Sequence, residues 1–463
     1  GLVGLGVGTG QQWLDFCVMA GHPEWAEDAS LFSDRGALAD AIDDWVGAQT
    51  VDEVLDVATA FRIPNAPIVD GANAPSIAHF RERGSFITGE DGTVRPRPPL
   101  RITGGSPPAG VRTAEPSGTL PFSGLRVLDM TAYWAGPSAS HLLAMLGAEV
   151  IHLESSRRPD GARMVGVRPS STERYWERGP IFAALNTDKK GLTLDFGTPE
   201  GLDLLRRAIA TCDVVIENYT PRVLDGLGFT YEALSELRED LVVVRMPGFG
   251  LDGPWRDNAA FAFVIEDASG LTWLTGHPDQ HPVEPYCVGD SNAGVHAMYG
   301  LLLGLAHRDA TGAGCQVEAA MVDAALSITA EQVVEHSSTG VRLAREGNRG
   351  SDAAPQNLYD CAGLDEHGRE PNRVAIAVAT DDQWAALCAA LGAPEWATDP
   401  ALAHHGGRVA AHEVVDRHLA AWCAQRDPDE VVATLWDAGV PVARVMQPHR
   451  QADLPPLQAR HFF

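Results

Sequence analysis

A carboxylate in the setting of a nucleophile stands in the stretch CVGDSNAG, residues 287–294. Asp290 lies between Gly289 and Ser291, after a short apolar stretch that we expect to be a strand and before small residues typical of a helix. One interpretation is helix capping, in which Asp290 or Ser291 accepts hydrogen bonds from the unpaired amides of the first turn. The other is covalent catalysis, in which the carboxylate attacks a carbonyl carbon and Gly289 leaves room for a bulky thioester. The spacing alone leaves both interpretations open.

Two glycine-rich stretches resemble phosphate-binding turns, and each departs from what such a turn requires. The chain opens with GLVGLGVGTG, whose glycines at 4, 6 and 10 lack the G-x-G-x-x-G spacing of a dinucleotide-binding loop. Residues 248–253 have that spacing after an apolar strand, but residues 254–267 show little of the helix that binds a pyrophosphate. We interpret the second stretch as a turn that shapes the wall of a pocket.

The elements that must position Asp290 alternate between strands and helices. Residues 124–130 and 241–250 contain apolar runs typical of buried strands. Residues 135–154 and 198–218 each have the pattern of a helix followed by a strand, and residues 291–340 are helical and rich in small residues. This alternation predicts an α/β fold with a mostly parallel, doubly wound sheet.

A long internal repeat divides the chain. Residues 3–31 align without a gap with residues 374–402, and a tryptophan, a cysteine and a Pro-Glu-Trp triplet recur in both copies. Each copy predicts a strand, a helix, an acidic second helix and another short strand. In the second copy alanines replace the opening glycines. Close packing of a strand therefore explains both copies, whereas a phosphate-binding loop explains only one.

The repeat sets the domain boundaries that we expect. They are a small-domain segment of a first unit at 1–86, a proline- and glycine-rich extended tail and linker at 87–120, a large domain at 121–345 and a second small domain at 346–463. On this interpretation the chain is a segment of a tandem fusion that starts inside a unit. Its two units are expected to pair with each other, or the chain with another copy.

Composition excludes several classes of function. The 463 residues include 45% apolar residues, which is enough for substantial cores, and the net charge of −27 argues against nucleic-acid binding. No apolar run approaches the roughly 18 residues of a transmembrane helix. The seven cysteines are scattered and form no C-x-x-C motif, which favours a reducing cytoplasm and argues against a zinc site. We therefore expect a cytoplasmic protein with no membrane, nucleic-acid or metal partner.

Several motifs, in order along the chain, resemble one family. They are FSGLRVLDMTAYWAGPSASHLLAMLGAEVIHLES (122–155), NTDKKGLTLDFGTPEG (186–201), CDVVIENYTPRVLDGLGF (212–229), MPGFGLDGPW (246–255), VGDSNAG (288–294), HRDATGAGCQVEAAMVDAAL (307–326) and GNRGSDAAPQNLYDC (347–361). Together they resemble the class III CoA-transferases, the CaiB/BaiF or formyl-CoA transferase-like family. The duplicated segment resembles the small domain of that family, so the resemblance covers essentially the whole chain.

The resemblance implies a fold and a mechanism. The fold would be a large Rossmann-like domain with a smaller α/β domain, in subunits that interlock like links of a chain. Asp290 would attack an acyl-CoA and become an aspartyl-CoA thioester, which a carboxylic acid then resolves. Amides near Gly289 or residues 248–250 would stabilise the oxyanions. Coenzyme A would enter as a substrate, and no tightly bound cofactor is expected.

The resemblance also implies which residues contact CoA. The positions that match its CoA loop and the adenine and pantetheine path are Tyr133, Trp134, Ala135, Leu194 and Asn218. The basic residues expected to meet its phosphates are Arg157, Arg158, Lys189 and Lys190, the last two being the only lysines among 35 basic residues. For each basic residue the alternative is a solvated surface charge.

The sequence departs from the family pattern at three points. Gly197 stands where some members carry a lysine, residues 260–263 (AFAF) are apolar where many carry an acidic or polar residue, and the GHD-type motif of the racemase branch is absent. The leading hypothesis is an acyl-CoA:carboxylate CoA-transferase. The alternatives are a catalytically silent CoA-binding or scaffolding unit, and another acyl-CoA enzyme of the same fold, an isomerase or a lyase-coupled transferase.

Overall fold

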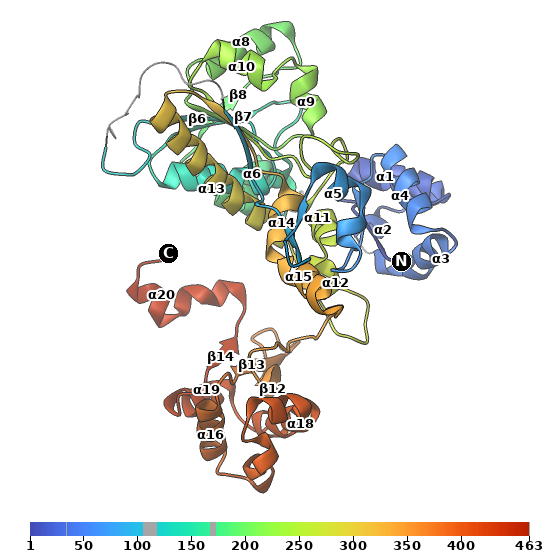
Figure 1. Ribbon diagram of the computed structural model, residues 1–463, viewed down its shortest axis with the longest axis vertical. Helices are drawn as coiled ribbons and strands as arrows, with labels where there is room; N and C mark the ends of the chain where they lie inside the picture. The colour runs from blue at the N-terminus through green and yellow to red at the C-terminus, as the bar shows by residue number, and fades with distance from the viewer. Residues whose placement is uncertain (34, 105–117, 167–172, 463) are drawn as a thin grey trace. The chain divides into compact units, whose positions relative to one another are not determined.

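The computed structural model describes residues 1–33, 35–104, 118–166 and 173–462, and it divides into two compact units (Figure 1). The first unit comprises Gly1–Gly276 and Gln280–Arg345. The second comprises His277–Asp279 and the chain from Glu346 onward. The first unit thus contains both the N-terminal copy of the repeat and the segment that carries Asp290.

A seven-stranded sheet forms the centre of the first unit, in the order β5-β11-β10-β9-β6-β7-β8. Its strands are β5 (Arg101–Gly104), β6 (Arg126–Asp129), β7 (Glu149–Glu154), β8 (Lys190–Thr193), β9 (Val214–Glu217), β10 (Val242–Arg245) and β11 (Cys315–Glu318). All neighbours are parallel except β5 and β11. The predicted α/β fold with a mostly parallel sheet is confirmed.

Helices cover both faces of this sheet. Successive side chains of a strand point to opposite faces, and in a strand with apolar residues at successive positions both faces must be buried. In β10, Val242 and Val244 pack in one apolar cluster with α6 (Ala135–Met145) and α13 (Val288–Thr311). Val243 packs in the other with α8 (Pro199–Ile209) and α10 (Tyr231–Leu237). Figure 1 shows α8 and α10 on the opposite side of the sheet from α6 and α13.

Two of the opening glycines, Gly4 within a strand and Gly6 just after it, pack closely on a helix. The strand β1 (Val3–Leu5) pairs antiparallel with β2 (Asn65–Pro67). A Cβ added at Gly4 would lie 1.6 Å from Oδ2 of Asp267, and one added at Gly6 would lie 1.9 Å from the ring of Phe263. Both neighbours belong to α11 (Ala262–Ser269). These glycines therefore allow β1 to approach α11.

The remaining N-terminal helices are α1 (Gly10–Met19), α2 (Ala29–Ser33), α3 (Ala39–Gly47), α4 (Val51–Ala60) and α5 (Ala78–Arg83). The segment after them joins the large sheet. Strands β3 (Phe86–Thr88) and β4 (Val94–Pro96) form a hairpin, and β5 pairs with β11. Part of the expected linker at 87–120 is therefore an edge of the central sheet, and residues 105–117 lie outside the described part.

The glycine turn at 248–253 packs against this N-terminal tail. Gly250 and Gly253 have φ of +100° and +82°, and a Cβ on Gly250 would lie 2.1 Å from Cζ of Arg83. The side chain of Arg83 is buried and forms ion pairs of 2.8 Å with Glu318 and with Asp323. No helix follows the turn until α11, which confirms that the turn does not open a pyrophosphate-binding helix.

The second unit contains an antiparallel sheet of β12 (Gln356–Leu364), β13 (Pro371–Ala377) and β14 (Val442–Val445). Its longer helices are α16 (Asp381–Ala390), α18 (His412–Cys423) and α19 (Pro428–Asp437). The first helix of each repeat copy starts with the same capping box, Thr9 with Gln12 in α1 and Thr380 with Gln383 in α16. The two copies therefore begin alike in local structure.

Two further observations concern helices and thiols. No helix among the described residues has both the length and the apolar character needed to cross a bilayer. All seven cysteines fall within the described ranges, and all are free thiols.

Candidate active site

Asp290 lies in the first turn of α13, the 24-residue helix that packs along the sheet. The N-cap residue is Cys287, with φ of 59°, and no side chain caps this end of the helix. The capping interpretation of Asp290 is therefore wrong. The expected strand before it is also absent, because residues 275–287 contain no strand. The positive end of the helix dipole stabilises a negative charge on a carboxylate in the first helical turn.

The electrostatic setting of Asp290 opposes its ionisation. Burial, followed by the nearby carboxyl group of Glu266, raises the pKa of Asp290 to about 7. Glu266 is 0% exposed, and burial raises its pKa to about 7 as well. The charge on Asp290 therefore depends on pH close to neutrality.

The backbone amide of Gly289 is hydrogen-bonded within the protein. It donates a hydrogen bond of 2.9 Å to Oε1 of Glu266. The sequence predicted that amides near Gly289 or at residues 248–250 stabilise an oxyanion, and in this structure the hydrogen bond of the Gly289 amide goes to a carboxyl group. A Cβ on Gly289 would lie 3.1 Å from the carbonyl oxygen of Ala262, so the glycine lets α13 start close to α11.

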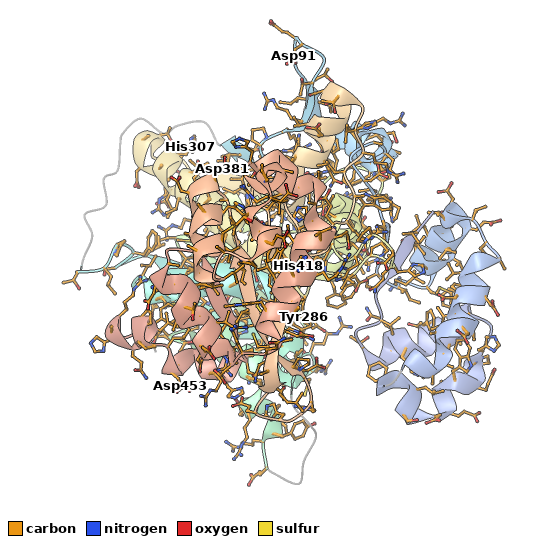
Figure 2. The ribbon with its side chains drawn as sticks, turned by 90° about the horizontal axis from the view of Figure 1, so that it is seen from below. Asp91, Tyr286, His307, Asp381, His418 and Asp453 are labelled. Atoms are coloured by element: carbon orange, nitrogen blue, oxygen red, sulfur yellow. The ribbon has the colours of Figure 1, made fainter. Side chains whose placement is uncertain are left out.

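Close packing of α13 on α6 brings Asp290 near the predicted CoA loop. Gly294 lies one turn after Asp290, and a Cβ added there would lie 2.0 Å from Oγ of Ser138 and 2.9 Å from the carbonyl oxygen of Ala135. Just before α13, the ring of Tyr286 meets that of Trp134 edge to face at 6.4 Å. Tyr286 is 83% exposed (Figure 2). The structure thus brings Trp134 and Ala135 to the end of α13 that carries Asp290.

The loop between β6 and α6 has a fixed backbone. Tyr133 has φ of 67°, and its amide donates to Oδ1 of Asp160 at 2.8 Å. Asn218 binds the backbone of Ala132, the residue before Tyr133, through two hydrogen bonds. Its Oδ1 accepts from the Ala132 amide at 2.9 Å, and its Nδ2 donates to the Ala132 carbonyl at 2.8 Å. Asn218 therefore orders the loop in this structure.

A cavity of about 700 Å³ opens beside this loop. Its lining includes Tyr133, Arg157, Arg158, Asp195, Phe196 and Tyr219. Arg157 is 79% exposed and its Nε lies 3.3 Å from Oδ2 of Asp195. The two predicted arginines and the tyrosine thus share one cavity. Leu194 is half-buried next to Asp195, and its amide donates to the Glu154 carbonyl at 2.8 Å.

The structure places the two lysines elsewhere. The side chain of Lys189 is 1% exposed, and its Nζ lies 3.0 Å from Oδ2 of Asp129 and 2.8 Å from Oγ of Ser140. Lys190 is 71% exposed and pairs with Glu149 at 2.6 Å, beside a different cavity. The geometry does not support the expected phosphate contacts, because one ammonium group is buried in the protein and the other lies at another surface.

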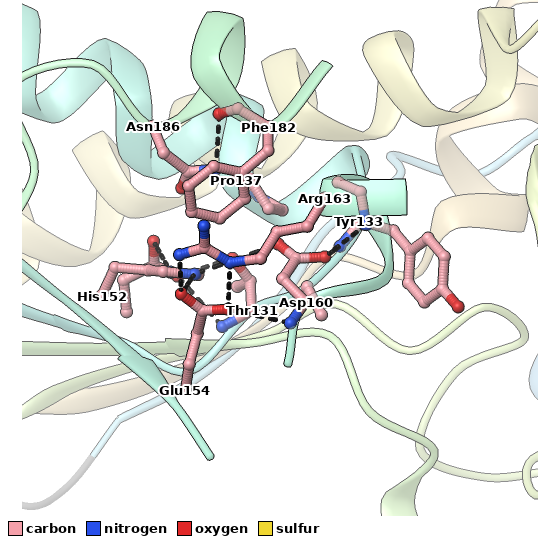
Figure 3. A network of polar contacts seen from close by, with 12 residues as sticks. Thr131, Tyr133, Pro137, His152, Glu154, Asp160, Arg163, Phe182 and Asn186 are labelled. Carbon is pink, nitrogen blue, oxygen red and sulfur yellow. Dashed lines mark hydrogen bonds and ion pairs between the residues drawn. The ribbon is translucent and has the colours of Figure 1, made fainter. Parts of the chain in front are cut away.

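A polar network beneath the loop was not anticipated from the sequence (Figure 3). Oδ1 of Asp160 accepts hydrogen bonds from the amides of Tyr133 and Ala162. Arg163 donates two hydrogen bonds of 2.9 and 2.6 Å to Glu154. The amide of Asp160 in turn donates to Glu154 at 2.9 Å. The sequence signal was a cluster of charges, ESSRRPDGAR, directly after a buried strand. The network fixes the wall of the cavity that contains Tyr133.

Comparison with known proteins establishes the family of this chain. The sequence model of CoA-transferase family III matches residues 1–118 and 122–463, so the chain belongs to that family. A succinyl-CoA–D-citramalate CoA-transferase of Chloroflexus aurantiacus is 33% identical over 326 residues, covering 70% of this chain and 78% of the relative. A formyl-CoA:oxalate CoA-transferase of Escherichia coli is 30% identical over 345 residues, covering 70% and 81%. A CaiB/BaiF family protein from Brucella suis superposes with a TM-score of 0.65 at 30% identity, covering 74% of this chain and 88% of that structure.

Proposed function

We propose that this protein is an acyl-CoA:carboxylate CoA-transferase in which Asp290 is the nucleophile and carries CoA as an aspartyl thioester. One observation carries the proposal. Asp290 stands in the first turn of α13, and that helix packs on the start of α6 at Gly294, beside the loop of Tyr133 and its cavity. A nucleophile, a cavity and basic side chains at its mouth therefore belong to one region of the first unit.

The chemistry proceeds by exchange of acyl bonds. The Asp290 carboxylate attacks the thioester carbonyl of an acyl-CoA, forms a mixed anhydride and releases CoA as a thiolate. The thiolate attacks the Asp290 carbonyl carbon of the anhydride, which yields aspartyl-CoA and frees the first carboxylate. The incoming carboxylate reverses the two steps, so Asp290 is regenerated as a new acyl-CoA forms. Each bond broken is replaced by a bond of similar energy, and water must be kept out.

Arginines at the cavity mouth suit the phosphates of CoA. Arg157 and Arg158 come from the segment after β7, and they line the same cavity as Tyr133. A guanidinium group binds phosphate through paired N–H donors. CoA bound there would direct its thioester arm along the 133–135 loop toward Asp290. CoA is a substrate in this proposal, and pairing with a second CoA-transferase unit stays a prediction.

The proposal is tested by an exchange assay on the full chain. A panel of acyl-CoA thioesters, including succinyl-CoA and formyl-CoA, is combined with a panel of free carboxylic acids, and new acyl-CoA is followed by liquid chromatography. We expect at least one donor–acceptor pair to exchange, and we expect Asp290→Asn to abolish that exchange. Exchange that survives in the Asn variant would contradict the assignment of Asp290. An absence of exchange with every pair would contradict transferase activity.

A further inference from the structure

A second buried carboxyl group lies directly beneath the backbone that leads into Asp290. Glu266 belongs to α11, and its side chain is fully buried. Its Oε1 accepts the amide hydrogen of Gly289 at 2.9 Å. Its Oε2 is buried and has no hydrogen-bond partner among the described residues. One oxygen of this carboxyl group is therefore fixed by the first turn of α13, and the other has no group to share its charge.

The close approach of two helices holds Glu266 in this position. A Cβ added at Gly289 would lie 3.5 Å from Cγ of Glu266 and 3.1 Å from the carbonyl oxygen of Ala262. Ala262 lies in the AFAF stretch, which lacks an acidic residue. Glu266 follows it by four residues, so it lies one turn further along the same face of α11. Helix α11 thus presents its carboxyl group to the start of α13 one turn after that stretch.

The surroundings of Glu266 and Asp290 oppose the ionisation of both carboxyl groups at the same time. Besides burial, Glu284, on the segment before α13, raises the pKa of Glu266 and also that of Asp267, the next residue in α11. All three residues are acidic. Burial, followed by the nearby carboxyl groups of Asp290 and Glu266, raises the pKa of the Cys287 thiol to about 11. Two like charges in a buried site favour retention of one proton between them.

We propose that Glu266 is a positioning residue for Asp290: it fixes the Gly289 amide through Oε1 and shares one proton with the Asp290 carboxyl group. This inference rests on the proposed function. While Glu266 is ionised, the shared proton resides on Asp290, and loss of this proton as the pH rises makes Asp290 the carboxylate that attacks the thioester. Asp290 then becomes part of the anhydride, and CoA leaves as a thiolate. No proton transfer is required in the chemical step.

The inference predicts a pH profile that a purely structural role would not give. Ionisation of Glu266 raises the pKa of Asp290, so removal of that charge should allow Asp290 to ionise at lower pH. Glu266→Gln keeps an oxygen that accepts from the Gly289 amide, and it places an uncharged NH₂ group at Oε2. This variant separates the effect of charge from the effect of shape.

The experiment measures formation of the CoA adduct on Asp290 from pH 5 to pH 9. The full-length wild type and Glu266→Gln are mixed with one reactive acyl-CoA, quenched with acid and digested, and the adduct is quantified by mass spectrometry. We expect the acidic limb of the rate profile to move to lower pH by on the order of one unit in Glu266→Gln, with a rate within about threefold of wild type at pH 9. Glu331→Gln, an exposed position on α15 (Ala330–Thr339), is the matched control and should leave the profile unchanged.

A second variant gives an independent answer. Glu266→Ala removes the charge and also the acceptor for the Gly289 amide. We expect the same shift of the acidic limb and a rate lower by about tenfold or more at every pH, since the first turn of α13 loses its anchor. Circular dichroism and the melting temperature establish that each variant is folded. The pH profile of either folded variant tests the expected shift of the acidic limb.

The outcomes separate this inference from the proposed function. Acidic limbs that superimpose in wild type and in a folded Glu266 variant would overturn the shared proton. An acidic limb that moves to higher pH would overturn it as well. If wild type forms no adduct at any pH with any thioester, the proposed function itself fails.

Discussion

The Nζ atom of Lys189 lies 3.0 Å from Oδ2 of Asp129, and both side chains are buried. Burial alone would raise the pKa of Asp129, but the Lys189 ammonium and His152 outweigh it and lower that pKa. Lys189 also donates to Oγ of Ser140 and to the carbonyl oxygen of Pro137. This lysine connects β6, α6 and the start of β8.

Removal of this ammonium group should destabilise the fold. Lys189→Met leaves the Asp129 carboxylate buried without its main countercharge, so we expect the free energy of unfolding to fall by about 3–5 kcal/mol. Lys190→Met is the matched control, because its exposed pair with Glu149 is worth roughly 0–1 kcal/mol. Urea unfolding followed by circular dichroism measures both. Similar stabilities for the two variants would contradict a structural role for Lys189.

Asp267 should make stability depend on pH. Both oxygens of its carboxyl group are buried without a hydrogen-bond partner among the described residues, and burial, followed by Glu284, raises its pKa to about 8. Because the folded-state pKa is raised, the contribution of this group to stability is full below about pH 4 and is lost as the pH rises to about 8.

Substitution of this carboxyl group should remove that pH dependence. We expect Asp267→Asn to raise the free energy of unfolding at pH 8 by about 2 kcal/mol or more, and to change it little at pH 4.5. Urea unfolding at the two pH values is the measurement. Asp203→Asn, an exposed position on α8, is the control and should show no such difference. A gain of equal size at both pH values would contradict the titration of Asp267.

The first glycines should be required for packing and not for binding a phosphate. Gly4→Ala would place a methyl group against Asp267, so we expect a loss of about 1–3 kcal/mol in unfolding free energy. Gly10→Ala is the matched control, because nothing lies within 4 Å of a Cβ added there. Thermal unfolding distinguishes them. If both changes are equally harmless, the close approach of β1 to α11 is not a constraint.

The arginines at the cavity should act on the phosphates of CoA alone. In Arg157→Ala/Arg158→Ala we expect the KM for an acyl-CoA to rise by about tenfold or more, with little change in kcat, because each lost charged contact weakens binding by about 1.5–3 kcal/mol. An acyl-pantetheine thioester, which lacks the nucleotide, is the matched control and should be used equally well by both enzymes. An equal rise in KM for both thioesters would place these arginines outside the phosphate site.

Local motifs predicted more of this molecule than long-range contacts did. The alternation of strands and helices predicted the parallel sheet, and the GDSN stretch predicted the candidate nucleophile Asp290, because both patterns are contained in short segments. Glu266 was missed because its importance depends on the approach of α11 to α13. An acidic pair, Glu266 and Asp267, at the end of the apolar run AFAFVI was the available signal.

The lysines show why charge alone did not locate a phosphate site. The sequence places Lys189 and Lys190 next to each other, but successive residues at the start of β8 point in opposite directions. Lys189 therefore turns into the protein toward Asp129, and Lys190 turns toward Glu149 at the surface. The pairing of β6 with β7 and of β7 with β8 determines which carboxylates lie within reach.

We expect Asp290 to carry CoA during turnover. The most direct test is the mass of the tryptic peptide that contains Asp290, measured after the full chain is incubated with the acyl-CoA that exchanges fastest and then quenched with acid. We expect a fraction of that peptide to gain the mass of CoA less one water, and we expect the free carboxylic acceptor to remove the label. An unmodified Asp290 peptide during active exchange, or a CoA adduct that persists in Asp290→Asn, would contradict the assignment of Asp290 as the residue that carries CoA.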